Sequence, residues 1–346
     1  MIEPKFSIIV PVYNAQSTIK KTIKTLQTLD YDDYEVIIVN DGSTDDTEKL
    51  IVTLTEGNPI FQLITTENNG PGIARNTGIE QAKGSYILLF DADDEPSRSI
   101  LKDYDQLLTD QPEADLIVSS FLFRTMDNDK VVSEKVNQVS DTIYRNHETF
   151  LEDMYHLMNQ QLMYVVWNKC YRREIVMRQN IRFRNYRSCE DRIFNLEYYQ
   201  HCQYVIMNPT VEYTYEFVGG KGITNKYHPN KFQTFKEFYL LANDVTNQIN
   251  KPGMAALLLK GTTSVIFSIY GNSNQTSKEK NREAKKILAD PVILEAKNIA
   301  LTDSTAKKVT KLLYKLPAPI FLSAVRIGSF VEEKMPGLMA FLKRSY

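Results

Sequence analysis

An acidic cluster follows a strongly apolar segment early in the chain. Asp91, Asp93 and Asp94 come directly after residues 87–90, and only Ala92 interrupts them. Carboxylates this close together repel one another and raise each other's pKa. A divalent cation removes that cost, and Mg²⁺ or Mn²⁺ commonly binds through one or two carboxylates together with substrate phosphates. The cluster therefore indicates a metal site. The alternative is a solvated acidic turn, because aspartate is common in turns.

Short apolar segments rich in β-branched residues alternate with helical patterns before and after this cluster. The strands are expected at 6–12, 35–40, 61–64, 85–90 and 115–121, and the helices at about 15–29, 45–55 and 73–83. This alternation predicts an α/β fold with a mostly parallel sheet and helices on both faces. Ligands of such sheets bind beyond the carboxyl ends of the strands. We therefore expect Asp41, at the second strand end, to face the same site as the acidic cluster.

The rest of the chain carries weaker patterns. Residues 127–139 are polar, and we expect a surface excursion without a strand. Helical patterns return at about 147–160 and 192–200, and the chain beyond about 229 reads as mostly helical. The expected domains are therefore an α/β domain over 1–229, which contains the acidic cluster, and a helical region over 230–346.

Bulk composition narrows the classes of protein. The formal net charge is −2, so no overall basic field argues for nucleic acid as a partner. The three cysteines have no CxxC spacing, which suits a reducing compartment. The first residues lack a signal-peptide pattern, and the apolar stretch at 316–331 is interrupted by Pro317, Pro319 and Arg326. We expect a cytoplasmic protein.

Four motifs at the strand ends resemble those of family 2 glycosyltransferases with the GT-A fold. They are SIIVPVYN at 7–14, VNDGSTD at 39–45, NGPGIARNTG at 69–78 and DADD at 91–94, and their order matches the family. The resemblance continues through 167–169 and 190–191 and fades after about residue 230. One partial match competes: Gly70-Pro71-Gly72 resembles the start of a dinucleotide fingerprint. Arg75 stands where its third glycine belongs, so we reject a nicotinamide-dependent dehydrogenase.

The resemblance implies a UDP-sugar donor site at the strand ends. The first strand end would pack on the nucleobase and ribose through four residues, Pro11, Val12, Tyr13 and Asn14. Asp41 would accept from the uracil N–H, or else it is a turn and cap residue. Asn69 and Arg75 would help hold the donor, Arg75 near phosphate, although Arg75 is equally a solvated helix charge.

The same resemblance divides the acidic motif Asp91-Ala92-Asp93. Asp91 would face the ribose or the outer shell of the metal. Asp93 would coordinate Mn²⁺ or Mg²⁺ at the donor diphosphate, where the cation offsets the charge of the leaving group.

A second acidic pair, Glu190-Asp191, precedes an expected helix. The resemblance makes Asp191 the general base that takes the proton of the acceptor hydroxyl, with Glu190 as the second candidate. Attack opposite the leaving group would invert the anomeric centre. The alternative is a helix cap, because Ser188 and Asp191 have capping-box spacing and acidic residues stabilise a first helical turn.

Four further candidates are weaker. Trp167 would stack on an acceptor sugar, or it belongs to the core. Lys221 and Thr224 lie in a segment that resembles a loop closing over the diphosphate, where Gly222 replaces the more usual serine. His228 is either a further metal ligand or an ordinary surface histidine.

The C-terminal residues 306–346 interleave lysines and arginines with apolar residues. They predict either contact with an anionic membrane surface, which would make the protein peripheral on the inner face of the cell membrane, or ordinary helix packing. Such packing would be on the catalytic domain or on a second subunit of a homo-oligomer. We expect an inverting transferase that moves a hexose or N-acetylhexosamine from a UDP-sugar to a glycan, polyol-phosphate or lipid-linked acceptor in surface polysaccharide synthesis. The alternatives are a sugar-phosphate nucleotidyltransferase, which needs a glycine-rich loop after the first strand, and a scaffold protein with a decayed site.

Overall fold

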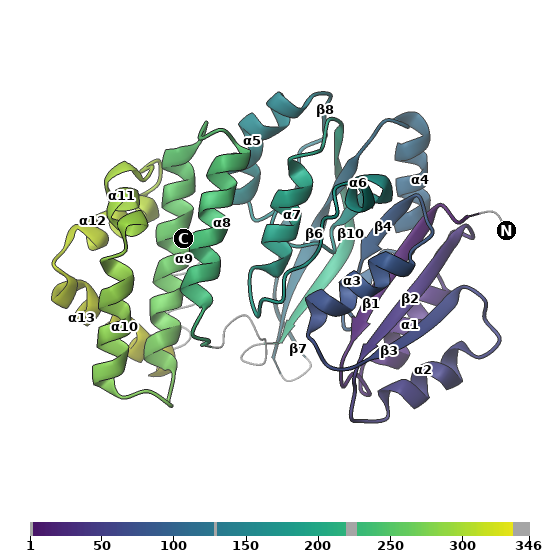
Figure 1. Cartoon of the computed structure of the whole chain (residues 1–346), viewed down its shortest axis with the longest axis horizontal. Helices are drawn as coiled ribbons and strands as arrows, with labels where there is room; N and C mark the ends of the chain where they lie inside the picture. Colours follow the sequence, from purple (N-terminus) through teal and green to yellow (C-terminus); the bar gives the residue numbers. More distant parts are fainter. Residues whose placement is uncertain (1–2, 128–129, 219–226, 335–346) are drawn as a thin grey trace. The chain divides into compact units, whose positions relative to one another are not determined.

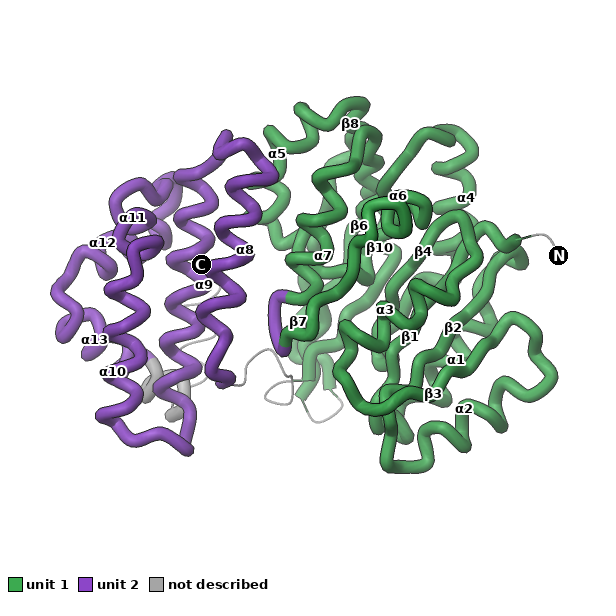
Figure 2. The backbone as a smooth tube through the Cα atoms, in the orientation of Figure 1, with its two compact units in different colours: residues 1–186, 190–222 green, residues 187–189, 223–346 purple. Residues whose placement is uncertain are grey.

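The computed structural model describes residues 3–127, 130–218 and 227–334. The chain divides into two compact units (Figure 2). The first comprises residues 1–186 and 190–222, and the second comprises residues 187–189 and 223–346. The sequence placed the border between residues 229 and 230.

The first unit is built on a ten-stranded sheet (Figure 1). Its main order is β3-β2-β1-β4-β9-β6-β10-β5, with β7 paired to β6 and β8 paired to β10. The strands are β1 (Phe6–Val12), β2 (Tyr34–Asp41), β3 (Phe61–Thr66), β4 (Tyr86–Leu89), β5 (Glu95–Pro96), β6 (Leu116–Asp127), β7 (Lys130–Asn137), β8 (Thr142–Tyr144), β9 (Lys169–Arg172) and β10 (Val205–Val218). The helices are α1 (Ile19–Gln27), α2 (Thr47–Thr55), α3 (Pro71–Gln81), α4 (Ile100–Asp110), α5 (His147–Asn159), α6 (Arg173–Arg178) and α7 (Glu190–Tyr199).

The first four strands are parallel, as the continuous apolar segments predicted. The chain runs outward from β1 through β2 to β3 and then returns to place β4 on the other side of β1. Right-handed crossovers in opposite directions put α3 on the opposite face from α1 and α2. The strand order therefore reverses between β1 and β4, and ligands of doubly wound sheets bind at such a switch point. The predicted fold class is confirmed.

One prediction about this unit is wrong. Residues 130–137, expected to be a surface excursion without a strand, form β7, which pairs antiparallel with β6. Both faces of β7 are exposed, so its sequence lacks the buried face that marks most strands. The β-branched Val131 and Val132 suit an edge strand, and Lys130 and Lys135 suit its exposure.

The second unit is helical, as the sequence predicted for the chain beyond about residue 229. Its helices are α8 (Lys231–Val245), α9 (Lys251–Gly271), α10 (Ser277–Leu288), α11 (Pro291–Ile299), α12 (Thr305–Lys315) and α13 (Ala318–Lys334). Side-chain caps start several of them: Thr276 and Glu279 form a capping box at α10, and Ser304 caps α12. Among the described residues, α9 alone is long and apolar enough to cross a membrane, and 56% of its apolar window is buried within the protein. That burial is typical of a core helix.

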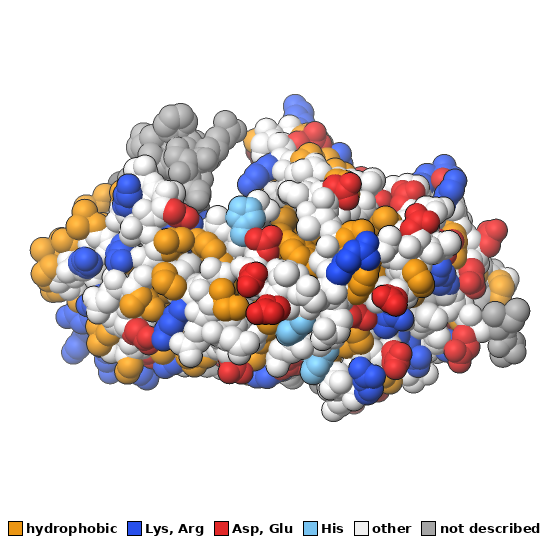
Figure 3. Space-filling model, turned by 90° about the horizontal axis from the view of Figure 1, so that it is seen from above, with side chains coloured by type: hydrophobic (Ala, Val, Ile, Leu, Met, Phe, Trp, Pro, Cys, Tyr) orange, Lys and Arg blue, Asp and Glu red, His pale blue; other side chains and the backbone are white. Residues whose placement is uncertain are grey.

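The surface agrees with the near-neutral composition. Acidic and basic side chains are interspersed over the face shown in Figure 3. This mixture fits the net charge of −2, and the coloured side chains on this face form no basic stripe like that of a nucleic-acid-binding protein.

Candidate active site

The ends of β1 and β2 are joined by side-chain hydrogen bonds. The Asn14 N–H donates to Ser43 Oγ over 2.9 Å, and Asn14 Oδ1 accepts from the Thr44 N–H over 2.8 Å. Asn14 has φ = 48°, a left-handed conformation that asparagine tolerates better than most residues. Val12 is buried, whereas Tyr13 is 51% exposed. Pro11 lies in β1 itself, so Tyr13 and Asn14 are the exposed members of the four predicted base-binding residues.

Asp41 closes the loop that leads into α3. Its two carboxylate oxygens accept from the Asn69 and Gly70 backbone N–H groups, each over 2.8 Å, and the side chain is buried. Gly42 has φ = 67°, and a Cβ there would lie 2.8 Å from the Asn68 backbone nitrogen, so only glycine fits. The Asn69 side chain donates to the Glu67 carbonyl oxygen. Asp41 thus has a structural role in the described chain, and contact with uracil stays a prediction.

The acidic motif after β4 is held on both sides. The Asp91 N–H donates to Tyr213 Oη over 3.1 Å, and the Ala92 carbonyl oxygen accepts from Thr22 Oγ1. Asp94 is buried, with one oxygen accepting from the Glu216 N–H at 3.3 Å and the other without a partner among the described residues. Asp93 is exposed. The motif therefore presents Asp93 outward while its neighbours are fixed.

The electrostatics of this motif favour a bound cation. Asp93 is exposed, but nearby protein atoms exclude water from part of it. This desolvation is the largest cause of the raised pKa of Asp93, and the charge of Asp91 is the second. The pKa of Asp94 is raised to about 9, mainly by burial and further by the charges of Asp91 and Asp93. A cation beside Asp93 would relieve this repulsion. Among the described residues no cluster of three or more His, Cys, Asp or Glu side chains forms a complete metal site. The residues fit a cation held by one or two carboxylates, with diphosphate and water completing its shell.

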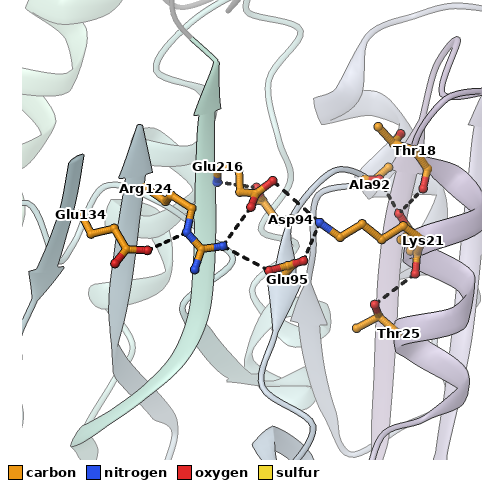
Figure 4. Close-up of polar contacts among 10 residues, drawn as sticks. Thr18, Lys21, Thr25, Ala92, Asp94, Glu95, Arg124, Glu134 and Glu216 are labelled. Atoms are coloured by element: carbon orange, nitrogen blue, oxygen red, sulfur yellow. Dashed lines mark hydrogen bonds and ion pairs between the residues drawn. The ribbon is translucent and has the colours of Figure 1, made fainter. Parts of the chain in front are cut away.

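An ion-pair network lies beside the acidic motif and joins α1, β5, β6, β7 and β10 (Figure 4). Lys21 lies 2.5 Å from Glu95, and Arg124 pairs with Glu216 at 3.0 Å and Glu134 at 2.8 Å. Lys21 also lies 3.8 Å from Glu216. These contacts fix the strands on either side of the residues that follow Asp93.

Arg75 is buried between two carboxylates. Its Nη2 lies 2.6 Å from Asp91 Oδ1, its Nη1 lies 3.3 Å from Asp191 Oδ1, and the residue is 4% exposed. Burial disfavours the charged guanidinium, but Asp191 and Asp91 outweigh that cost, so the pKa of Arg75 is raised. The prediction that Arg75 holds a donor phosphate remains untested. In the described chain its terminal nitrogens bind carboxylates, and it is not a solvated helix charge.

Asp191 lies in the first turn of α7, next to Glu190. Burial is the largest influence on its carboxyl. Although Arg75 opposes the shift, burial together with Glu190 and Asp91 raises the pKa of Asp191 to about 7. Burial also raises the pKa of Glu190. The Asp191 side chain keeps 24% of its surface accessible, which leaves a route for a substrate hydroxyl. Chemically, such a carboxyl can accept a proton near neutral pH.

Trp167 lies in the core. It is 3% exposed and stacks on Tyr213 and Tyr215, with ring centroids 4.7 and 5.4 Å away, while Phe121 meets it edge-on at 4.6 Å. Protein therefore covers this ring, in line with the core alternative. The aromatic row that it joins supplies the Tyr213 hydroxyl that contacts Asp91.

Sequence reasoning missed a set of buried polar residues around the loop at 162–166. Lys169 is fully buried and donates to the Leu162 and Val165 carbonyl oxygens over 3.0 and 2.6 Å. Asn195 donates to carbonyl oxygens of the same loop. Burial lowers the pKa of Lys169, and Asp191 opposes that shift. The signal that could have found Lys169 was its place between the apolar residues 165–167 and 170–171.

The described structure does not test the remaining candidates. Lys221 and Thr224 lie outside the described residues. His228 belongs to the second unit, and burial together with Lys231 and Arg187 lowers its pKa. Its Nε2 is buried without a partner among the described residues. Metal binding by His228 stays a prediction.

A doubly wound sheet with carboxylates at its switch point defines an α/β protein with a GT-A fold. The chain belongs to glycosyl transferase family 2, whose model matches residues 7–179. It is therefore a glycosyltransferase, as the strand-end motifs indicated.

Two curated relatives and two solved structures are similar to this chain. The putative glycosyltransferase EpsH of Bacillus subtilis is 26% identical over 307 residues, 86% of each chain. Poly(ribitol-phosphate) beta-N-acetylglucosaminyltransferase TarS of Staphylococcus aureus is 28% identical over 200 residues, 56% of this chain and 32% of TarS. Residues 1–349 of TarS, solved with UDP-GlcNAc, share the fold with a TM-score of 0.69 at 18% identity, over 95% of this chain and 92% of that one. The mannosyltransferase PcManGT of Pyrobaculum calidifontis, solved with GDP-Man and Mn²⁺, gives a TM-score of 0.50 at 17% identity, over 97% and 88%.

Proposed function

We propose that this glycosyltransferase is an inverting, metal-dependent enzyme that transfers a sugar from a UDP-sugar. The observation that carries the proposal is the convergence of Asp91 and Asp191 on Arg75, with the exposed Asp93 two residues from Asp91. A carboxylate for a cation and a carboxylate for a proton thus lie at one switch point, which is what transfer from a nucleoside diphosphate requires.

The donor side supports a nucleotide. Tyr13 offers an exposed aromatic ring at the end of β1, where a nucleobase can stack. Asp93 is the proposed metal ligand, and Asp91 is proposed to face the ribose or the outer shell of the metal. UDP is the proposed carrier because TarS was solved with UDP-GlcNAc. Mn²⁺ or Mg²⁺ is the proposed cation, since PcManGT was solved with Mn²⁺.

Asp191 is the proposed general base. The acceptor hydroxyl would reach the accessible part of its carboxylate, transfer its proton there, and attack the anomeric carbon as the bond to the diphosphate breaks. A carboxyl with a pKa of about 7 is half ionised at neutral pH and takes a proton more readily than an ordinary aspartate. Attack opposite the diphosphate inverts the anomeric centre.

Surface polysaccharide synthesis is the proposed setting. The name of TarS specifies transfer of N-acetylglucosamine to poly(ribitol phosphate), and we extend to this chain only a hexosyl or N-acetylhexosaminyl group and a glycan, polyol-phosphate or lipid-linked acceptor. We further propose that the protein is cytoplasmic and peripheral on the membrane. The support is a set of exposed apolar residues, Val309 and Leu312 on α12 and Ile320 and Ile327 on α13. The two on α12 lie among lysines, and Ile327 follows Arg326.

A thermal-shift panel of nucleotide sugars, each with and without Mn²⁺, tests the donor and the metal. A ligand at about 100 times its Kd stabilises the fold by about 2.7 kcal/mol. We expect the largest shift for one UDP-sugar with Mn²⁺ and loss of the metal-dependent part in Asp93→Asn. Asp110→Asn, at the exposed end of α4, is the control and should behave as wild type.

The panel also separates the alternatives. Absence of a shift with every UDP-sugar would reject the proposed donor. Metal-dependent hydrolysis of the bound UDP-sugar to UDP and free sugar would exclude a non-catalytic nucleotide-sugar-binding scaffold.

A further inference from the structure

The side chain of Arg75 meets the two carboxylates from different parts of the chain. Asp91 follows β4, whereas Asp191 begins α7, 100 residues later in the sequence. Nη2 binds Asp91 and Nη1 binds Asp191, so each terminal nitrogen of one rigid, planar guanidinium has its own carboxylate. The separation of the two carboxylates is therefore set by the dimensions of a single side chain.

The plane of the Arg75 guanidinium is itself supported from α7. It lies over the Phe183 ring, 5.3 Å from the ring centroid. Phe183 in turn stacks on Phe194 of α7, with ring centroids 4.1 Å apart and planes 6° from parallel. Helix α7 thus carries both Asp191 and Phe194, the ring that backs Phe183 behind the guanidinium of Arg75.

Helix α3 also holds Phe183 in place. Asn76, the neighbour of Arg75, accepts from the Phe183 N–H and donates to the Phe183 carbonyl oxygen, both over 2.8 Å. A Cβ at Gly72 would lie 3.1 Å from Phe183 Cβ, so the glycine permits this close approach. Gly72, Arg75 and Asn76 therefore form one face of α3 that docks on the segment before α7.

We propose that Arg75 is a positioning residue that fixes Asp91 of the donor side against the base Asp191, and that it does not bind the donor diphosphate. This rests on the proposed function. It differs from the role expected from the sequence, in which Arg75 holds phosphate. The two roles predict different results, because a diphosphate contact affects UDP and not uridine, whereas a positioning role affects turnover.

The binding experiment compares UDP with uridine by calorimetry in the presence of Mn²⁺, using the full chain. A guanidinium–phosphate contact is worth more than about tenfold in affinity. We expect Arg75→Gln to leave the ratio of the UDP and uridine affinities within about threefold of wild type, a factor well below that contact. A selective loss of UDP affinity would overturn the proposal while leaving the proposed function intact. Failure of wild type to bind UDP would overturn both.

The turnover experiment follows hydrolysis of the UDP-sugar that gives the largest thermal shift, in which water takes the place of the acceptor hydroxyl and UDP is released. We expect Arg75→Gln to lower kcat by about 100-fold, the loss expected when a catalytic group moves by roughly 1 Å. Arg75→Lys should not restore kcat, because one ammonium cannot replace a two-pronged fork. Full rescue by lysine would indicate a simple charge and contradict positioning. The double variant Arg75→Gln/Asp191→Asn should be no slower than Asp191→Asn alone, since both act through one base. Additive losses would also contradict it.

Arg172→Gln is the matched control. Arg172 also pairs with a carboxylate, Asp115 at 3.4 Å, and also lies over an aromatic ring, Tyr86 at 5.4 Å. It has no contact with the acidic motif among the described residues, so we expect its variant to keep wild-type kcat after correction for the folded fraction. An equal loss in Arg172→Gln would show that the Arg75 effect is one of general stability. If Arg75→Gln does not fold, Arg75→Lys in both experiments decides the question.

Discussion

The two halves of the catalytic unit hold their site residues by different means. In the parallel half, residues 6–94, the backbone ladder places the strand ends: Val12 lies opposite Asn40 in the pairing of β1 with β2, and Asp41 opposite Thr66 in that of β2 with β3. In the mixed half, residues 95–186 and 190–218, buried polar side chains do much of this work. The loop at 162–166, for example, is fixed by Lys169 and Asn195 rather than by pairing with a strand.

This difference teaches where chemistry can be read from a sequence. A residue that follows a parallel strand is placed at the site by the pairing of that strand. The apolar pattern that marks the strand is visible in the sequence. A residue positioned by a hydrogen bond from a distant side chain carries no such mark. The carboxylates of Asp91 and Asp93 belong to the first kind. The residues that surround Asp191 belong to the second kind.

The largest expected effect is the loss of the proposed base, Asp191. Asp191→Asn keeps the size of the side chain but cannot accept a proton, and a general base typically contributes about 10²–10⁴-fold to a rate. We expect kcat for UDP release to fall by about 10³-fold, with UDP affinity within a small factor of wild type.

The control for Asp191→Asn tests the helix-cap alternative. Glu148 occupies the first turn of α5 and is exposed, so Glu148→Gln removes a comparable charge from a helix start. It should leave kcat unchanged. If Asp191→Asn lowers the melting temperature as Glu148→Gln does and leaves kcat intact, Asp191 is only a cap.

The sequence predicted the parallel half well because its signals are local. Phe6–Val12 and Tyr34–Asp41 are continuous apolar strands, and their ends carry the motifs. The sequence also named Arg75 and Asp191, but only through a family resemblance. It did not show that they contact each other, because 116 residues separate them. The support from Asn76 and Phe183 was missed for the same reason, as was the exposed strand β7.

The next largest effect concerns pH. The base must be ionised, and burial holds the pKa of Asp191 near 7, so the rate should rise with pH up to about 7 and then level off. Below the pKa the ionised fraction falls about tenfold per pH unit, so kcat at pH 5 should be about 100-fold below its plateau. Kinetics between pH 5 and 9 with saturating donor would measure this limb.

If kcat does not change between pH 5 and 9, the raised pKa of a buried Asp191 base is contradicted. The profile also sharpens the comparison of the two halves, because burial in the mixed half, and not the donor carboxylates alone, raises the pKa of the base.

A smaller effect is expected for the loop at 162–166. Lys169→Met removes the ammonium that three oxygens share, on Leu162, Val165 and Asn168. Buried carbonyl groups left without a donor cost about 1–3 kcal/mol, so we expect the free energy of unfolding to fall by about 2 kcal/mol. Urea unfolding would measure it, with the exposed Lys24→Met as the control. A change no larger than that of the control would show that side chains do not hold this half.

The smallest effect concerns the loop contact in the parallel half. Asn14→Ala removes the acceptor of the Thr44 N–H and places alanine at φ = 48°. A net hydrogen bond is worth about 1 kcal/mol, and the left-handed conformation adds about 1 kcal/mol for a residue with a Cβ. We expect a loss of about 1–2 kcal/mol in the free energy of unfolding.

Asn14→Gly separates these two contributions to the stability of the loop. Glycine accepts the left-handed conformation without cost, so it should recover about half of the loss and leave only the missing hydrogen bond. If glycine is no better than alanine, the side chain of Asn14 carries the whole effect. In that case even the parallel half depends on a side-chain contact at its strand ends, and its difference from the mixed half is one of degree.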